Sequence, residues 1–288
     1  VECVSRYGKG NADSLPDTSN PIFRAPGERS KVRAEGGHGD WAPADGLPDL
    51  YIAMGQTAEN VAELKGVSRE AMDEYGVMSQ NKAEEAIARG FFEMDITPVT
   101  MPDGTVVSAD DGPRAGVTLD AVSQLKPAFR PDGRITAGNA CPLNDGAAAV
   151  VVMSRKRAEE LGITPMARII ASSVSALNPE IMGLGPIEAI KRVLARANMS
   201  MSDIDLVEIN EAFAAQVIPS ADELGIDMVN QLNVNGGAIA LGHPFGQTGA
   251  RIMTTLLNGL QDSDKTFGLE SMCVGGGQGM AMIVERLN

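Results

Sequence analysis

Cysteine and histidine are scarce in this chain of 288 residues, which has three cysteines and two histidines. Cys3, Cys141 and Cys273 lie far apart and form no Cys-x-x-Cys pair, so the sequence argues against a disulfide framework. His38 and His243 have no neighbour at a ligand spacing, and we therefore expect no metal site. An odd number of scattered cysteines is typical of a reducing compartment, which predicts a cytoplasmic protein.

Long apolar runs and an excess of basic charge are also missing. No segment has the length of a membrane span, and the hydrophobic content of 43% is ordinary for a globular protein. The net charge of −14 argues against nucleic acid as a partner, because no basic stripe could neutralise the phosphates. A small anionic ligand stays compatible, since a few placed Arg or Lys residues and helix N-termini can hold it.

The chain lacks an initiator methionine and a signal peptide, and Val1–Ser5 does not begin a helix. We therefore expect a piece of a longer protein. Its 288 residues favour two structural units. Residues 1–50 are rich in Gly, Pro, Asp and Ser and lack periodicity, which predicts a long loop with an excursion at residues 35–40.

The rest of the chain alternates between helical and strand patterns. Predicted helices are Ser68 to Arg89 (apolar face Met72, Tyr75, Ala83, Ala86 and Ile87), a short one ending at Gly162, one opened by Pro186 (stripe Ile187, Ile190, Val193, Leu194 and Ala197), Ala212 to Leu224, and one around Ile252 to Leu260. Predicted strands are a hairpin from Ile96 to Val107, a fully buried run from Ala147 to Met153, then Ala167 to Ala171, Leu206 to Ile209, and two final strands around the last glycine run. This order predicts an α/β fold with βαβ units on a mixed sheet.

His243 lies in a glycine-rich segment, Gly242-His-Pro-Phe-Gly-Gln-Thr-Gly249, just before a predicted helix. Glycine permits unusual φ angles and close approach of a ligand, and Pro244 stiffens the backbone beside the histidine. Because histidine titrates near neutral pH, the residue suits general-base work or donation to an oxyanion. The alternative is a turn histidine that bonds only to backbone.

Cys273 ends an apolar strand and enters a second glycine run, which closes at Gly279. Consecutive N–H groups in such a run can form an anion-binding nest, and a polarised site can lower the pKa of a thiol. A small buried apolar residue at a strand end explains the same cysteine equally well.

Asn210 follows the predicted strand Leu206–Ile209 and precedes a helix. An asparagine in that place is most often an N-cap. The functional alternative is that it orients a water or donates to an oxyanion at the carboxyl edge of the sheet, where open α/β sheets bind their ligands. Nucleotide-binding loops and the serine-hydrolase elbow fail on spacing, because G-x-G-x-x-G, G-K-[ST] and G-x-S-x-G are all absent.

Seven segments together resemble the thiolase family of acetyl-CoA acyltransferases over essentially the whole chain. They are Met54-Gly-Gln-Thr-Ala-Glu-Asn60, Thr136-Ala-Gly-Asn139, Leu143-Asn-Asp-Gly-Ala147, Met182-Gly-Leu-Gly-Pro186, Asn210-Glu-Ala-Phe213, Gly242-His-Pro-Phe-Gly246 and Cys273-Val-Gly-Gly-Gly277. The last three, in this order and spacing, are highly specific. The resemblance implies thiolase-like βαβαβ layers with mixed five-stranded sheets, plus an irregular α+β loop domain.

The resemblance also implies a ping-pong acyl transfer between CoA thioesters. A nucleophilic cysteine takes an acyl group from a 3-ketoacyl-CoA or acetyl-CoA, and CoA or a second acetyl-CoA accepts it. His243 would activate the nucleophile and then stabilise a thioester oxygen, together with a water held by Asn210. Cys273 would exchange a proton with C2 of acetyl-CoA or with the incoming thiol. The amide of Gly275 would belong to a second oxyanion hole, and preorganised donors of this kind usually supply the largest catalytic effect.

By the same resemblance, residues 1–7 are the remnant of an N-terminal half-domain and 8–142 form a CoA-binding loop domain. Residues 143–162 would complete the N-terminal half-domain, and 163–288 would be the C-terminal one. Arg114 matches an arginine near the CoA nucleotide. Positions that match the pantetheine and acyl tunnel are Met54, Phe129, Cys141, Leu143, Met182, Ala212 and Phe213. CoA thioesters would be the only small molecules bound, with no separate cofactor.

Several positions depart from the family pattern. Cys141-Pro142 replaces a Ser-Gly pair common in short-chain members, which puts a pantetheine hydrogen bond in doubt, and Ala53 replaces a histidine, which would make room for longer acyl groups. The nucleophilic cysteine is missing from this chain. It lies upstream of a phrase whose tail resembles Val1–Ser5, so Cys3 is not the nucleophile and we expect the chain as given to be inactive.

Two alternatives stay open. The chain could be a non-catalytic CoA-binding or assembly fragment, or a condensing enzyme of the ketosynthase type, which shares the fold. The second would use two histidines beside its nucleophile, and Cys273 holds one of those places. For the intact protein the resemblance implies a homodimer or homotetramer acting in fatty-acid β-oxidation or the wider metabolism of lipids.

Overall fold

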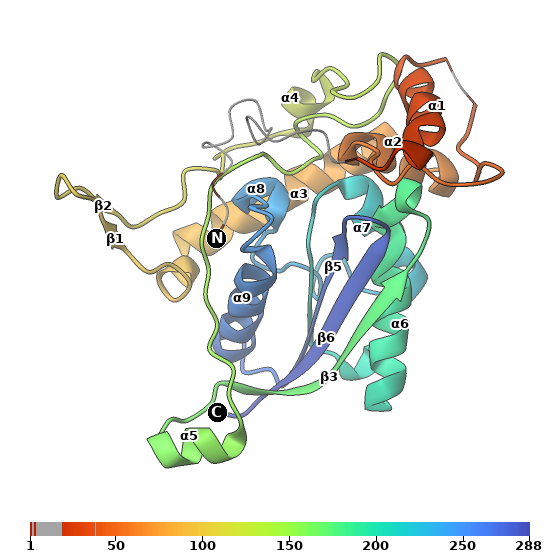
Figure 1. Ribbon diagram of the computed structural model, residues 1–288. Coiled ribbons are helices and arrows are strands. Elements are labelled where there is room, and N and C mark those ends of the chain that lie inside the picture. The colour runs from red at the N-terminus through yellow and green to blue at the C-terminus, as the bar shows by residue number, and fades with distance from the viewer. Residues whose placement is uncertain (2, 4–18, 38) are drawn as a thin grey trace.

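The computed structural model describes residues 1, 3, 19–37 and 39–288, and its helices and strands follow one another as Figure 1 shows. The helices are α1 (Arg24–Ala34), α2 (Met54–Lys65), α3 (Arg69–Ala88), α4 (Leu119–Ser123), α5 (Arg155–Leu161), α6 (Gly185–Ala197), α7 (Ala214–Leu224), α8 (Ala238–Leu241) and α9 (Thr248–Asp262). The strands are β1 (Val99–Thr100), β2 (Val106–Val107), β3 (Ala167–Ala176), β4 (Leu206–Ile209), β5 (Phe267–Val274) and β6 (Gln278–Arg286). Short 3-10 turns cover Pro21–Phe23, Phe91–Glu93, Pro179–Leu184 and Met201–Asp203.

The centre of the described part is a mixed four-stranded sheet with the order β3-β6-β5-β4. β5 is parallel to β4 and antiparallel to β6, which in turn is antiparallel to β3. The expected fifth strand is reduced to one parallel bridge between Val207 and Leu232, because Asn233 turns the chain away with φ +44°. The α/β class is confirmed, with one strand fewer in this sheet.

Helices cover both faces of the sheet, and Figure 1 shows α6 and α9 on opposite sides of it. Alternation along the strands explains this arrangement, because successive side chains point to opposite faces. Val207 and Ile283 pack into the core that contains α6 and α7, whereas Leu206 and Val284 pack against α9. Apolar residues of α2 and α3 join the first of these cores, so the segment before residue 142 rests on α7.

Most of the predicted elements are confirmed. α3 begins after the N-cap Ser68, whose side chain accepts from the N–H of Ala71, and the predicted hairpin turns at Gly104. The stripes on α6 and α9 are buried as expected except for Ala197 and Leu257, which are half-buried, and the two final strands are β5 and β6. The expected burial of Ile87 is wrong, because the last turn of α3 presents this side chain to solvent.

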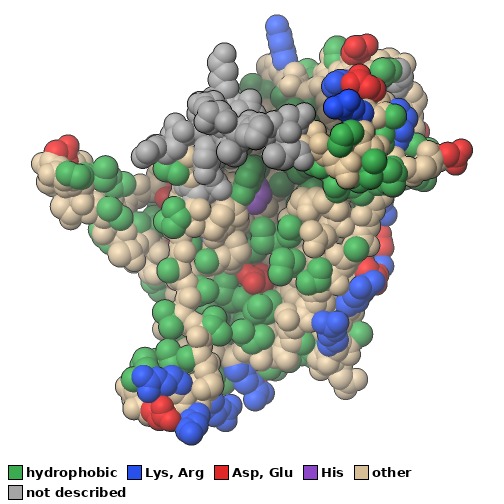
Figure 2. All heavy atoms as spheres, in the orientation of Figure 1, with side chains coloured by type: hydrophobic (Ala, Val, Ile, Leu, Met, Phe, Trp, Pro, Cys, Tyr) green, Lys and Arg blue, Asp and Glu red, His purple; other side chains and the backbone are tan. Residues whose placement is uncertain are grey.

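The strand expected from Ala147 to Met153 is wrong. The segment forms no strand, and Val151 is 84% exposed. A buried strand needs neighbours that take up its N–H and C=O groups, and none lies beside this run in the described part of the chain. Figure 2 shows that hydrophobic side chains gather in the middle of the face turned to the viewer, between α1 above and α5 below.

Two further expectations are wrong, one about the loop at residues 1–50 and one about the start of α7. Residues 1–50 are not all loop, since α1 covers Arg24–Ala34. Only Pro26 of this helix is buried, so the sequence has no apolar stripe that would predict the helix. α7 begins at Ala214, with Phe213 and not Asn210 as its N-cap. The side chain of Asn210 is therefore available for another partner.

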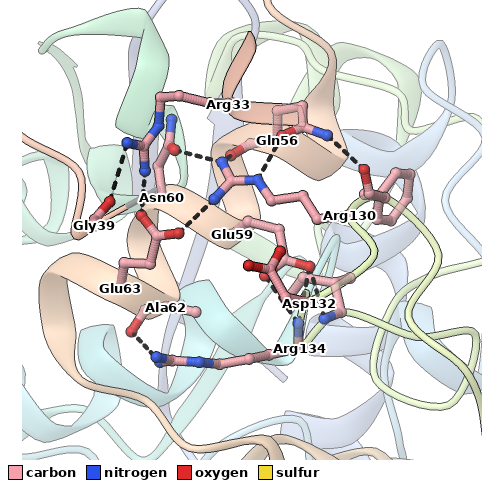
Figure 3. Close-up of polar contacts among 12 residues, drawn as sticks. Arg33, Gly39, Gln56, Glu59, Asn60, Ala62, Glu63, Arg130, Asp132 and Arg134 are labelled. Atoms are coloured by element: carbon pink, nitrogen blue, oxygen red, sulfur yellow. Dashed lines mark hydrogen bonds and ion pairs between the residues drawn. The ribbon is translucent and has the colours of Figure 1, made fainter. Parts of the chain in front are cut away.

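A buried set of charged and amide side chains holds the segment before residue 142 together; we call it the Arg130 cluster (Figure 3). Its members are Gln56, Glu59, Asn60, Glu63, Arg130 and Arg134. Arg130 donates through Nε to Gln56 (2.7 Å), through Nη2 to Asn60 (2.7 Å) and through Nη1 to Glu63. Glu59 accepts from the backbone N–H groups of residues 134 and 135. Each of these contacts joins α2 to the loop at residues 129–135.

Candidate functional site

Asn210 lies at the carboxyl end of β4, where the sequence places it. Its backbone N–H donates to the carbonyl of Ser271 on β5 (3.0 Å), and the residue is buried. Because β4 and β5 are parallel, their carboxyl ends lie at one edge of the sheet, and Cys273 is two residues further along β5. The amide Nδ2 of Asn210 is 3.3 Å from Nε2 of His243. Two of the predicted site residues are thus in direct contact.

Hydrogen bonds on the far side of the imidazole determine its tautomer. Nδ1 of His243 is 2.7 Å from Oγ1 of Thr248, and that hydroxyl donates its one proton to the carbonyl of Pro244 (2.9 Å). Thr248 can therefore only accept from the ring, so Nδ1 carries the proton. The electron pair of Nε2 then accepts a long hydrogen bond from Nδ2 of Asn210 (3.3 Å) and can take up a proton in its place.

Burial keeps this imidazole neutral. Desolvation, followed by the charge of Arg251, lowers the pKa of His243 to about 4. The ring of Phe245 lies edge-on to it, with centroids 4.9 Å apart. At neutral pH the residue is a proton acceptor, and once protonated it becomes a strong hydrogen-bond donor.

The backbone around His243 is held by the segment at residues 143–146. Asn144 accepts from the N–H of His243 (3.0 Å). Gly242 has φ +89°, and a Cβ there would collide with the side chain of Asn144. Glycine is therefore required at this position for both conformation and space. Two of the segments that carry the family resemblance, at residues 143–147 and 242–246, thus pack directly on each other.

Cys273 is buried near the end of β5, and Gln216 of α7 links it to Asn210. The thiol is 3.4 Å from Oε1 of Gln216, whose Nε2 donates to the carbonyl of Asn210 (3.1 Å). One chain of hydrogen bonds therefore joins Cys273, Gln216, Asn210, His243 and Thr248, and we call these residues the His243 cluster. Burial raises the pKa of the Cys273 thiol to about 11, so it is protonated at neutral pH.

Several residues expected along a tunnel also lie together. Phe129 and Phe213 stack edge to face with centroids 6.0 Å apart, and the N–H of Cys141 donates to the carbonyl of Ala212 (3.0 Å). Met182, Ala212 and Phe213 share one apolar core with Cys273. Burial, and then the neighbouring Cys273, raises the pKa of Cys141 to about 12.

The remaining predicted residues lie at the surface. Gly275 is exposed in the turn between β5 and β6, and its carbonyl accepts from Gln278 (3.1 Å). Met54 begins α2 and is partly exposed, while Leu143 is exposed next to Asn144. Arg114 is exposed, and its N–H donates to the side chain of Gln80 on α3 (3.1 Å). Among the described residues no hydrogen bond or ion pair joins Arg114 or Leu143 to the His243 cluster, so their roles stay predictions.

Within the described residues, no group of three or more His, Cys, Asp and Glu side chains could hold a metal ion. In the same part of the chain no helix is long and apolar enough to cross a membrane.

Sequence reasoning missed three polar side chains of the site: Asn144, Gln216 and Thr248. Each had a weak signal. Gln216 is a lone amide on the buried face of α7, where its neighbours are Ala214, Ala215 and Val217. Asn144 lies in a segment noted only for its family resemblance and Thr248 in one noted for its glycines, and only the folded chain shows that both contact His243.

Comparison with known proteins matches both halves of the chain. The family model "Thiolase, N-terminal domain" matches residues 24–156, and "Thiolase, C-terminal domain" matches residues 163–286. An acetyl-CoA acetyltransferase of Cupriavidus necator is 49% identical over 293 residues, which cover 99% of this chain and 73% of that protein.

Two solved structures are similar to the chain. They are the acetyl-CoA acetyltransferase of Bacillus anthracis (TM-score 0.79, 44% identity) and the human mitochondrial 3-ketoacyl-CoA thiolase in complex with CoA (TM-score 0.77, 39% identity). The matches cover 85% and 82% of this chain, and the chain spans 61% and 59% of those two structures.

Proposed function

This chain belongs to the thiolase family of acyltransferases, and on that premise we propose that it serves the thiolytic cleavage of 3-ketoacyl-CoA and the reverse condensation of acetyl-CoA. The observation that carries the proposal is the continuous hydrogen-bonded path from Cys273 through Gln216 and Asn210 to His243. It brings a proton donor and a proton acceptor to one edge of the sheet.

His243 takes the first proton in this proposal. In the resting state Nε2 is unprotonated and accepts only the long hydrogen bond from Asn210, so it can accept the proton of a nucleophilic thiol. The new N–H then points toward the side from which the proton came and can donate to the thioester oxygen as negative charge develops there. The low pKa of His243 makes the protonated ring a strong donor.

Cys273 supplies the second proton. In cleavage, the bond between C2 and C3 of the 3-ketoacyl-CoA breaks and its electron pair stays on C2. The proton of the Cys273 thiol completes acetyl-CoA, and the acyl group remains on the nucleophile until the thiol of CoA takes it. A thiol with a pKa of about 11 holds its proton until such a carbanion forms, which suits it to the acid role.

Asn210 would hold a water against the same thioester oxygen. Its Oδ1 is buried and has no hydrogen-bond partner among the described residues, while its Nδ2 already faces His243. A buried unpaired acceptor is costly, and a water would satisfy it. The amide of Gly275 would donate to the oxygen of the second thioester.

The nucleophile itself is none of the three cysteines of this chain. Only the thiolate attacks, and the pKa values of Cys141 and Cys273, raised to about 12 and about 11, leave almost no thiolate at neutral pH. Cys3 is excluded by its place in the family pattern.

The substrates would bind along Phe129, Cys141, Met182 and Phe213, with Arg114 near the nucleotide of CoA. No cofactor beyond the CoA thioesters is needed for this chemistry. For the cellular setting we propose the cytoplasm, fatty-acid β-oxidation and a homodimer or homotetramer. The domain limits that accompany this proposal are 8–142 for the CoA-binding loop domain and 163–288 for the C-terminal half.

The test is thiolysis by the full-length protein. Acetoacetyl-CoA and a longer 3-ketoacyl-CoA are each mixed with CoA, and loss of the 3-ketoacyl-CoA absorbance is followed. Turnover of either substrate supports the proposal, and preference for the longer one supports the extra room expected from Ala53. No turnover of either would refute it.

A further inference from the structure

Glu211 follows Asn210 directly and has no part in the proposed chemistry, yet its carboxylate is the most heavily bonded one near the site. It is buried and accepts four hydrogen bonds. Tyr75 and Ser79 of α3 donate through their hydroxyls (2.9 and 2.6 Å). Asn233 donates through Nδ2 (2.8 Å), and Ile239 of α8 donates through its backbone N–H (3.1 Å).

The contact with α8 leads directly to the histidine. α8 ends at Leu241, and Gly242 and His243 follow it without a break. At the start of this helix a Cβ on Gly237 would collide with the Glu211 carboxyl group, so glycine is what allows the close approach. The N–H of Gly237 donates to Ser79, which also bonds to Glu211. The position of α8 is therefore fixed by Glu211 and α3.

The contact with Asn233 leads to the other partner of the histidine. Asn233 accepts from the N–H of Ile209 and donates to its carbonyl, both at 2.9 Å. Its side chain thus pairs with the last residue of β4 as a neighbouring strand would. Since both amide atoms are used, Asn233 cannot turn its side chain over without losing the two hydrogen bonds to Ile209 and the one to Glu211.

We infer that Glu211 is a positioning residue, whose carboxylate fixes the end of β4 against α8 so that the Asn210 amide faces Nε2 of His243. Asn210 directly follows Ile209, whose backbone is bonded by Asn233, and Asn233 in turn donates to the Glu211 carboxylate. His243 lies four residues after Ile239, whose N–H donates to the same carboxylate. Its importance for turnover rests on the proposed function, whereas the geometry does not.

An amide in place of the carboxylate tests this inference sharply. In Glu211→Gln one oxygen becomes an NH₂ group, which must face either Ile239 N–H or Asn233 Nδ2. The hydroxyls of Tyr75 and Ser79 can rotate to accept, but neither of these two donors can. The new NH₂ group therefore faces either the Nδ2 of Asn233 or the N–H of Ile239, and no hydrogen bond can form between two donors. The end of β4 or α8 must then move to separate them.

The measurement is ¹⁵N NMR of the imidazoles, which is simple because the chain has two histidines. His38→Gln assigns the signals. Asn210→Ala removes the bond to Nε2 and so calibrates its shift. We expect Glu211→Gln to move the Nε2 signal in the same direction by at least half as much. Glu211→Asp, which keeps the charge and the acceptors, should move it less.

Two controls keep the result decisive. Glu63→Gln replaces another poorly exposed carboxylate, one that bonds to Arg33 and Arg130, and should leave the signal in place. If Glu211→Gln does not fold, Tyr75→Phe removes one of the four donors without adding an unpaired one and should give a smaller shift of the same sign. An unmoved signal in the folded Glu211 variants, or in Tyr75→Phe where Glu211→Gln does not fold, overturns the inference, as does an Asn210→Ala spectrum equal to that of the parent.

Kinetics of the full-length protein separate this inference from the proposed function. Glu211→Gln should lower kcat of thiolysis at least tenfold with KM nearly unchanged, because the substrate-binding residues are not moved. If the parent protein shows no thiolysis but the NMR pattern holds, the proposed function fails and the positioning role stands. If the parent turns over and the NMR signal does not move, the positioning role fails alone.

Discussion

The Arg130 cluster and the His243 cluster are both buried polar networks, but only the first is saturated. Every nitrogen of the Arg130 guanidinium has an acceptor, and Glu59 accepts from two backbone N–H groups. In the His243 cluster Oδ1 of Asn210 has no partner within the described residues, and the contact of its Nδ2 with His243 is long, at 3.3 Å.

This difference separates architecture from chemistry. A fully paired buried network fixes one arrangement of the chain and leaves nothing for a ligand. A network with an unpaired acceptor and a weakly bonded imidazole nitrogen can still form hydrogen bonds to a ligand. Disrupting the first should therefore cost stability, and disrupting the second should cost turnover.

The largest effect on stability is expected for Arg130→Met. Loss of the guanidinium leaves Gln56 and Asn60 without a donor and Glu63 with Arg33 as its remaining ion-pair partner. Breaking a buried ion pair on one side costs about 3–5 kcal/mol, and we expect the lower end of this range because Arg33 stays. Urea denaturation should show this loss in the free energy of unfolding. Lys31→Met removes an exposed ion pair with Glu28 and should cost less than about 1 kcal/mol. Equal losses in the two variants would contradict the comparison.

The converse is expected for Asn210→Ala. In the proposed function this change removes the group that holds the donating water. Loss of one donor at an oxyanion site lowers kcat about 10²–10³-fold, and we expect thiolysis by the full-length protein to fall to this extent. Stability should change by less than about 1 kcal/mol, since one end of the amide is already unpaired and the other makes a long contact. Asn258→Ala is the matched control, because Asn258 bonds to Met94 and Asp95. A similar fall in kcat for both variants would count against a specific role of Asn210.

The sequence predicts parts of the fold and of the His243 cluster that depend on local patterns, and misses those that depend on distant partners. Strand Leu206–Ile209 and the stripe on α9 follow from local periodicity, and the glycines around His243 drew notice to the site. Gln216 and Glu211 were not found, because their partners are separated from them by up to 136 positions. The Ala147–Met153 error has the same origin: a strand depends on neighbours that its own residues do not specify. α1 was missed because it lacks an apolar stripe.

Acid should affect the His243 cluster in a defined direction. The pKa of His243 is lowered in the folded state to about 4 from the ordinary value of 6.5, so the unfolded chain binds the extra proton first as pH falls. The contribution of His243 to stability is complete above pH 6.5 and declines toward pH 4. Urea denaturation should show the free energy of unfolding of the parent falling more steeply across this range than that of His243→Asn. Parallel curves would mean that His243 titrates normally.

The smallest expected effect is none at all: the 288-residue chain should acquire no acetyl group from acetyl-CoA. Cys141 and Cys273 are protonated at neutral pH because burial raises their pKa values to about 12 and about 11, and a thiol does not attack a thioester at a useful rate. Intact-mass measurement after incubation tests this, with the urea-unfolded chain as a control for thiols released from burial. An adduct on Cys273 of the folded chain would show that the His243 cluster activates its own thiol, and would move Cys273 from the acid role to the attacking one. An adduct on Cys3 would overturn its exclusion as the nucleophile.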